Sequence, residues 1–149
     1  EIAQCLVGSE MCIRDSYQAR TLGASAILLI CSLLSQSELE EYQAIATELG
    51  MSALVEAHDE QEVEMALRAE ASIIGVNNRD LKTFTVDINN SARYRKMVPK
   101  EVSFVSESGI KTAEDIAKLL ENGTDAVLIG ETLMRSENKK QALDELRGM

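Results

Sequence analysis

The chain has 149 residues, of which 45% are hydrophobic, and this is enough for one ordinary domain with a single core. Its formal net charge at pH 7 is −10, and its lysines and arginines are scattered along the sequence. A surface that binds nucleic acid or anionic lipid needs a basic patch, so we expect neither partner. Small-molecule chemistry fits this composition better.

The sequence carries no signal for a membrane or a secreted protein. It has no apolar run of 18 or more residues and no basic N-terminal region followed by a long apolar stretch, so the expected compartment is the cytoplasm. The three cysteines, Cys5, Cys12 and Cys31, form no C-x-x-C pair and have no histidine nearby. We therefore expect neither a disulfide framework nor a metal site. Cys31 lies inside an apolar run and is interpreted as a small buried hydrophobic side chain.

From residue 17 onward, short apolar runs alternate with segments whose apolar residues recur at three and four positions. This alternation is typical of βα units. The expected strands are 26–31, 52–56, 72–76, 102–106 and 126–129. The expected helices are 35–50, a segment from residue 59, 90–97, 113–121, 131–134 and 138–147. Ser35 and Glu38 have the spacing of a capping box at the start of the first of these helices. Five consecutive units predict a mostly parallel sheet, either doubly wound or part of a barrel.

Polar residues or glycines follow four successive strands of this sheet. They are Glu56, Asn77, the pair Ser108 and Gly109, and Gly130. In both architectures ligands bind at the carboxyl ends of the strands, so these residues could converge on one ligand. Taken singly, each also fits ordinary turn or capping chemistry. Their coincidence across four units favours a site.

Two of these strand ends have the form of a phosphate cradle. Ser108-Gly109-Ile110 precedes one helix, and Gly130-Glu131 opens a short helix. Glycine lets backbone N–H groups approach an anion, and a helix N-terminus adds partial positive charge. Glu56, after an apolar strand, would point into a water-poor mouth and suits proton transfer. For His58, the only histidine, a structural or helix-entry role is favoured over catalysis.

Five segments of the sequence resemble strands four to eight of indole-3-glycerol-phosphate synthase, a (β/α)8-barrel family. The segments are Ala26-Ile-Leu-Leu-Ile, Leu54-Val-Glu-Ala-His58, Ile74-Gly-Val-Asn-Asn-Arg-Asp-Leu81, Val105-Ser-Glu-Ser-Gly-Ile110 and Val127-Leu-Ile-Gly-Glu-Thr-Leu-Met134. The resemblance covers about residues 17 to 149. It implies an α/β fold, an incomplete (β/α)8 TIM barrel of about five parallel βα units.

The resemblance also implies an activity and roles for individual residues. The family closes an indole ring on 1-(2-carboxyphenylamino)-1-deoxyribulose 5-phosphate, a phosphorylated small molecule, and releases carbon dioxide and water without a cofactor. The implied catalytic residues are Glu56, which helps proton transfer, and Asn77, which orients substrate. Ser108 would bind substrate. Gly109, Gly130 and the backbone N–H of Glu131 would hold the phosphate, and Arg79 would brace its loop.

The sequence departs from the family at its start. Family members carry a glutamate and a lysine on strand one and a catalytic lysine on strand three, but no lysine precedes Lys82 here. We interpret residues 1–16 as a non-matching segment, artefactual or disordered, and 17–149 as a partial barrel domain. A divergent native N-terminus is the alternative. The isolated chain is expected to be nearly inactive.

Two other functions stay open at this point. One is a phosphate-binding relative on the same fold, such as phosphoribosylanthranilate isomerase, although the 77–81 segment does not support it. The other is a non-catalytic half-barrel that binds phosphate or another half-barrel. Open sheet edges would favour association in either case.

Overall fold

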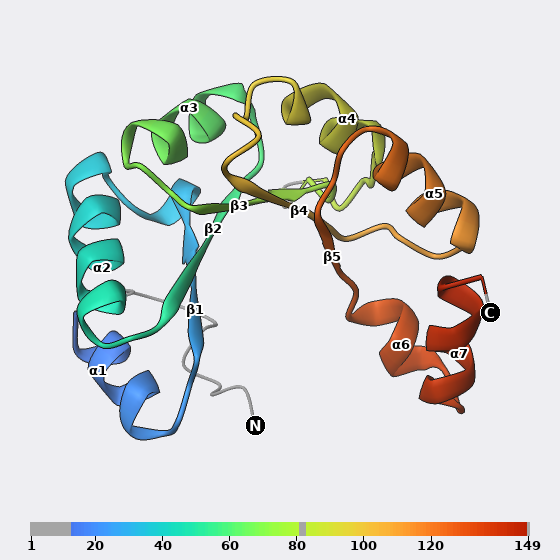
Figure 1. Ribbon diagram of the computed structural model, residues 1–149, viewed down its shortest axis with the longest axis horizontal. Helices are drawn as coiled ribbons and strands as arrows, with labels where there is room; N and C mark the ends of the chain where they lie inside the picture. The colour runs from blue at the N-terminus through green and yellow to red at the C-terminus, as the bar shows by residue number, and fades with distance from the viewer. Residues whose placement is uncertain (1–12, 81–82, 149) are drawn as a thin grey trace. The chain divides into compact units, whose positions relative to one another are not determined.

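The computed structural model describes residues 13–80 and 83–148 (Figure 1). Most of the predicted non-matching segment, residues 1–12, lies outside the described residues. Residues 13–16 form the start of the first helix, α1 (Ile13–Thr21).

Helices and strands alternate along the chain from α1 onward. The strands are β1 (Ala26–Ile30), β2 (Ser52–Ala57), β3 (Ile73–Asn77), β4 (Ser103–Glu107) and β5 (Ala126–Leu128). The later helices are α2 (Gln36–Glu48), α3 (Glu60–Arg68), α4 (Asn89–Arg95), α5 (Ala113–Glu121), α6 (Glu131–Arg135) and α7 (Lys139–Leu146), with a 3-10 turn, η2 (Cys31–Leu33), after β1.

The strands form one five-stranded sheet in the order β1-β2-β3-β4-β5. β1 pairs with β2 in parallel, with Ala26 opposite Ser52, and β4 pairs with β5 in parallel, with Val105 opposite Ala126. Sequence order and sheet order coincide because each helix carries the chain back to the same end of the sheet. The predicted series of parallel βα units is confirmed.

The chain divides into two compact units, residues 1–74 and 75–149. In the first unit, α2 contacts β1 and β2, and α3 contacts β2 and η2. Its core is formed by fully buried apolar side chains of strands and helices, namely Leu29, Leu39, Ala46, Val55, Val63 and Ala66. The continuous apolar runs of β1 and β2 supply the strand side of this core.

In the second unit, Phe104 of β4 is the largest fully buried side chain. Its backbone N–H donates to Asp125 Oδ2 at 2.8 Å, and the Arg95 guanidinium lies 5.5 Å from its ring centroid. Val76, Ile110 and Leu119 are also buried. The short helix α6 contacts α7, as Figure 1 shows, and α5 also contacts α7.

Side-chain caps fix where the helices begin. Ser35 and Glu38 form the capping box that their spacing predicts, with the Glu38 carboxylate accepting from Ser35 N–H at 2.8 Å. Asp59 caps α3 by accepting from the Glu62 N–H at 2.9 Å. Because each cap places the first helical turn, it also fixes the loop that leaves the preceding strand.

Most element boundaries differ by one or two residues from those expected, and two of these differences have a clear cause. Residues 31–33 form η2, so β1 ends one residue earlier than its apolar run suggests. β4 begins one residue later than expected, at Ser103, because the Val102 N–H is used in a turn to Pro99 O at 3.2 Å. The strand then continues through Glu107, so the turn that contains Ser108 and Gly109 follows it directly.

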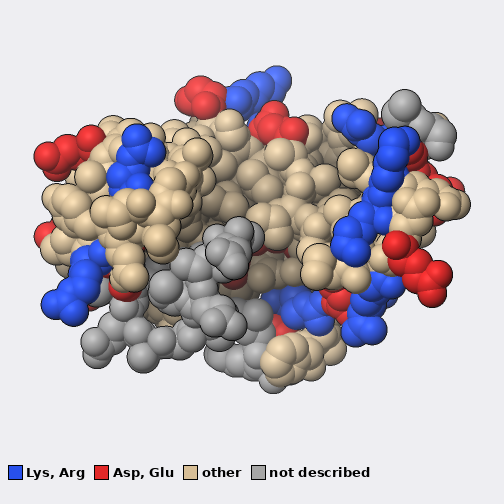
Figure 2. All heavy atoms as spheres, turned by 90° about the horizontal axis from the view of Figure 1, so that it is seen from below, with Lys and Arg blue, Asp and Glu red and all other residues tan. Residues whose placement is uncertain are grey.

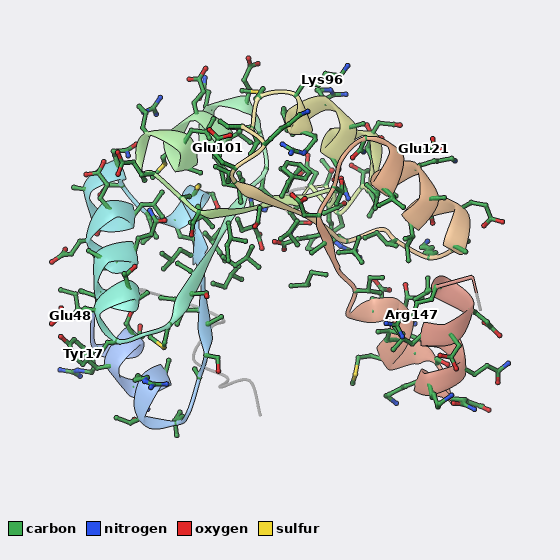
Figure 3. The ribbon with its side chains drawn as sticks, viewed as in Figure 1. Tyr17, Glu48, Lys96, Glu101, Glu121 and Arg147 are labelled. Carbon is green, nitrogen blue, oxygen red and sulfur yellow. The ribbon has the colours of Figure 1, made fainter. Side chains whose placement is uncertain are left out.

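Glu48 on α2 and Glu121 on α5 point away from the strands (Figure 3). Both are exposed. Among residues 13–80 and 83–148, no helix combines the length and the apolar character that crossing a membrane would need.

Candidate functional site

The residues singled out from the sequence fall in both units. Glu56 belongs to the first unit, at residues 1–74. The others, in the second unit, are Asn77, Ser108, Gly109, Gly130 and Glu131.

Glu56 lies near the end of β2 and is only 6% exposed. The His58 Nε2 atom is 3.0 Å from Glu56 Oε1, and its Nδ1 atom is 3.0 Å from Glu62 Oε2. The same Glu62 oxygen accepts the His58 backbone N–H at 2.8 Å. The imidazole is thus held between a strand-end carboxylate and a carboxylate from the first turn of α3.

These two carboxylates change the titration of the histidine. The contact with Glu56 and then that with Glu62 raise the pKa of His58 to about 10, against an opposing effect of burial. A neutral imidazole has only one N–H, whereas both ring nitrogens here face carboxylate oxygens. These contacts favour the charged imidazolium at neutral pH, and they place His58 between the end of β2 and the first turn of α3.

Cys31 lies in η2, which contacts both β2 and α3. Burial raises the pKa of its thiol to about 12, and the negative charges of Glu62, Glu56 and Asp59 act in the same direction. The thiol is neutral at physiological pH, which makes it a poor nucleophile and metal ligand. This agrees with the interpretation of Cys31 as a small buried side chain.

In the second unit, Asn77 ends β3 and is 9% exposed. Its Oδ1 accepts the Arg79 N–H at 3.0 Å, which turns the chain sharply as it leaves the strand. The next residue, Asn78, is 1% exposed, and its backbone N–H donates to Glu107 O of β4 at 2.9 Å. Asn78 therefore continues the sheet contact one residue beyond the end of β3.

The side chain of Asn78 uses its full hydrogen-bonding capacity. Its Nδ2 donates to Ser106 Oγ at 3.0 Å and to Ser108 O at 3.1 Å. Its Oδ1 accepts from the N–H and the hydroxyl of Ser91, at 3.2 and 2.9 Å. The two serine hydroxyls lie 2.7 Å apart. Since the Ser91 proton goes to Asn78, Ser106 must donate to Ser91, which closes a ring of three hydrogen bonds.

The turn after β4 has an unusual backbone. Ser108 has φ of 65° and Gly109 has φ of 79°, so two successive residues lie in the left-handed region. For Ser108 this conformation is strained, and the bond from Asn78 to its carbonyl holds it in place. A Cβ atom on Gly109 would collide with the Val86 side chain. Glycine is therefore required at position 109 for both conformation and packing.

The start of α6 carries the remaining predicted residues, Gly130 and Glu131. Gly130 is the N-cap, and in this described segment no side chain caps the helix. Open space surrounds the position of a Cβ atom on Gly130. The Thr132 hydroxyl donates to Ile110 O at 2.8 Å, which joins α6 to the segment after β4. Gly109 and Gly130 are thus on neighbouring, mutually bonded segments.

The Glu131 side chain is engaged by two arginines. Arg79 Nη2 lies 2.6 Å from Glu131 Oε2, and Arg135 Nε lies 3.0 Å from Oε1. Hydrogen bonds from Arg79 and then Arg135 hold the pKa of Glu131 below its usual value. Arg79 therefore braces the loop after β3 against α6. Two guanidinium groups around one carboxylate also leave this corner with a local charge of about +1.

The sequence interpretation missed several polar residues of this region. Asn78, Ser91 and Ser106 were not selected, and neither was Glu107, a 3% exposed glutamate at the end of β4. Glu107 had a visible signal, because a carboxylate directly before Ser108 repeats the strand-end pattern of Glu56. The two serines gave none, since each sits in an ordinary helix or strand segment.

The surface charge and the grouping of possible metal ligands also bear on what the chain can bind. On the face drawn in Figure 2, uncharged residues predominate, and basic and acidic residues both occur toward its edges. Across residues 13–80 and 83–148, no three histidine, cysteine, aspartate or glutamate side chains are grouped as metal ligands.

The Asn78 ring leads to a stability prediction. Asn78→Asp is nearly isosteric but removes both Nδ2 donors and buries a charge, so we expect it to lower the free energy of unfolding by about 3–5 kcal/mol in urea. The control is Asn90→Asp, where Oδ1 faces the exposed Arg93 guanidinium at 3.2 Å, and its expected change is within about 0.5 kcal/mol. Equal effects of the two substitutions would show that the ring does not matter.

The His58 cluster predicts how stability depends on pH. Below about pH 6.5 both folded and unfolded chains bind the proton, so the two ion pairs contribute fully. Between pH 6.5 and about 10 only the folded chain keeps it, and stability should fall by at most about 1.4 kcal/mol per pH unit. Urea unfolding at pH 7, 8 and 9 should show this decline in the parent and a flatter profile in His58→Gln. Identical slopes would exclude the charged imidazole.

Comparison with known proteins identifies relatives over most of the chain. The family model of indole-3-glycerol phosphate synthase matches residues 8–146. The curated enzyme of that name from Ruminiclostridium cellulolyticum is 58% identical over 132 residues, covering 89% of this chain and 51% of that protein. The one from Endomicrobium trichonymphae is 55% identical over 138 residues, covering 91% and 54%. The chain thus spans about half the length of these relatives.

Solved structures agree on the fold. 3-Hexulose-6-phosphate synthase from Salmonella typhimurium matches with a TM-score of 0.78 at 13% identity, covering 93% of this chain and 67% of that one. A mandelate oxidase matches with a TM-score of 0.75 at 17% identity, covering 91% and 52%. At such identities only the fold is shown, and it is α/β, an incomplete (β/α)8 barrel of five parallel units, as predicted. The family match and relatives above 50% identity show that the chain belongs to the indole-3-glycerol phosphate synthase family.

Proposed function

We propose that this chain is the C-terminal half of an indole-3-glycerol phosphate synthase and supplies one part of its active site. The reaction would be ring closure of 1-(2-carboxyphenylamino)-1-deoxyribulose 5-phosphate, with loss of carbon dioxide and water and no cofactor. The observation that carries this proposal is the series of polar groups at the carboxyl ends of β2, β3 and β4 and after β5, in a chain that belongs to this family.

In this proposal, some strand-end residues transfer protons while the indole ring forms, and others orient the substrate. Glu56 would move protons during ring closure and dehydration. Asn77 and Ser108 would bind and orient the substrate. The low exposure of Glu56 and Asn77 supports these roles, because groups held in a dry, packed setting keep one geometry.

The phosphate would be held at the ends of β4 and β5. Gly109, Gly130 and the Glu131 backbone N–H are the proposed contacts, and two features support them. The N-terminus of α6 carries no side-chain cap, so its N–H groups face no competing side chain among the described residues. The Glu131 carboxylate, which would otherwise repel a phosphate, is neutralised by Arg79 and Arg135.

The test is an activity assay of the chain with and without a complementing half. Family members carry catalytic lysines on strands one and three, and the described strands have no counterpart to them. The 149-residue chain alone should therefore form product at least about 10²-fold more slowly than a chimera that joins it to the N-terminal half of the Ruminiclostridium cellulolyticum enzyme. Product formation is followed by indole fluorescence.

Variants of the chimera separate catalysis from folding. Glu56→Gln should reduce kcat by roughly 10²–10⁴-fold, the usual loss for a group that transfers protons. Glu64→Gln is the matched control, because Glu64 lies on α3 with its side chain 55% exposed and paired with Arg68. Full turnover by the isolated chain, or a chimera that folds but makes no product, would contradict the proposal. A folded chimera that binds phosphate without turnover would favour a non-catalytic half-barrel.

A further inference from the structure

The first unit contains a chain of three polar side chains that family membership does not explain. It begins at Glu62 on α3, passes through His58 and ends at Glu56 on β2, with both nitrogen-to-oxygen distances at 3.0 Å. All three side chains are largely shielded, with 18%, 15% and 7% of their side-chain surface exposed. An exposed ion pair contributes little energy and leaves its side chains free to move, whereas a shielded ion pair holds its members in one geometry.

Glu62 is placed to orient the histidine rather than only to neutralise it. One of its oxygens contacts both the His58 backbone N–H, at 2.8 Å, and the ring Nδ1, at 3.0 Å. Its own backbone N–H is bonded to the cap residue Asp59 at 2.9 Å. The first turn of α3 thereby fixes the imidazole ring through Nδ1. Its Nε2 atom lies 3.0 Å from Glu56 Oε1 without the alignment of a hydrogen bond, so these two groups interact as an ion pair.

We propose that His58 is a positioning residue for Glu56, and that Glu62 sets the orientation of the His58 ring for this purpose. The inference rests on the proposed function, in which Glu56 moves protons for the reaction. A glutamate at a strand end has three rotatable side-chain bonds, so a fixed partner is needed to keep its carboxylate in one orientation. His58 supplies one such partner, together with a compensating charge.

His58 is not itself the group that exchanges protons with substrate. Both of its ring nitrogens carry a proton and face carboxylates, so neither nitrogen is available to accept a proton from substrate. The other titratable groups that face the cluster are Asp59 on α3 and the Cys31 thiol on η2, and the thiol stays neutral. The charge on the imidazolium is therefore set by Glu56 and Glu62.

The first arm of the test measures the cluster without any assay of activity. His58 is the single histidine of the chain, so its ring protons give one isolated pair of NMR signals in the 149-residue protein. The titration midpoint should lie near pH 10, and Glu62→Gln or Glu56→Gln should each lower it by at least one pH unit. Glu64→Gln, on the same helix, should leave it unchanged. A midpoint near 6.5, or no response to Glu56→Gln, overturns the inference.

The second arm measures positioning in the active chimera by a double-mutant cycle. His58→Ala should lower kcat by about 10- to 100-fold with little change in KM, because the carboxylate is misplaced while substrate contacts remain. His58→Gln, whose amide can still donate toward Glu56, should recover part of that loss. In a Glu56→Gln background, His58→Ala should have no further effect on kcat.

The outcomes of this cycle separate the inference from the proposed function. An unchanged kcat in His58→Ala, or an equal loss with and without the Glu56 carboxylate, overturns positioning, since a purely structural role lowers both backgrounds alike. If His58→Ala does not fold, the His58→Gln pair provides the same comparison. A folded parent chimera without activity contradicts the proposed function, and the NMR arm still decides whether both carboxylates hold His58.

Discussion

The buried amide of Asn78 is the contact on which the second unit depends. Its two donors and two acceptor positions are all used, and they reach three different segments: α4 through Ser91, β4 through Ser106, and the turn after β4 through Ser108. A fully satisfied polar network in a packed interior specifies one arrangement, because every alternative leaves a donor or acceptor unpaired. The left-handed backbone at Ser108 and Gly109 follows from this constraint.

The first unit uses a different interaction for a similar purpose. There a charged histidine between two carboxylates joins the end of β2 to the first turn of α3. Neither the Asn78 network nor the His58 ion pairs depend on the burial of a large apolar surface. In both, a polar side chain just beyond a strand fixes the segment that carries a proposed site residue, so the core supplies stability and the polar contacts supply geometry.

The sequence predicted the parts of this structure that depend on local patterns. Apolar runs located the five strands, and the spacing of Ser35 and Glu38 located a helix start, because both signals involve residues close together in the chain. The Asn78 ring was not predictable in this way, since its partners are 13 and 28 residues distant, and the Arg79–Glu131 pair spans 52 residues. Adjacent asparagines at 77 and 78 look alike in sequence, and only the fold determines which one is enclosed by serines. The Glu62–His58 contact lay within reach, as an i,i+4 pair on a helix start.

The account is tested most directly by hydrogen exchange at the Asn78 side chain. In an ¹⁵N-labelled sample, the two Nδ2 protons of Asn78 should exchange with water at least about 100-fold more slowly than those of Asn89, whose amide is exposed and bonded to Asp87 Oδ1. Slow exchange that is lost on removing the Ser106 hydroxyl would establish the ring as the constraint on the strand ends. Equal exchange at Asn78 and Asn89 would contradict it.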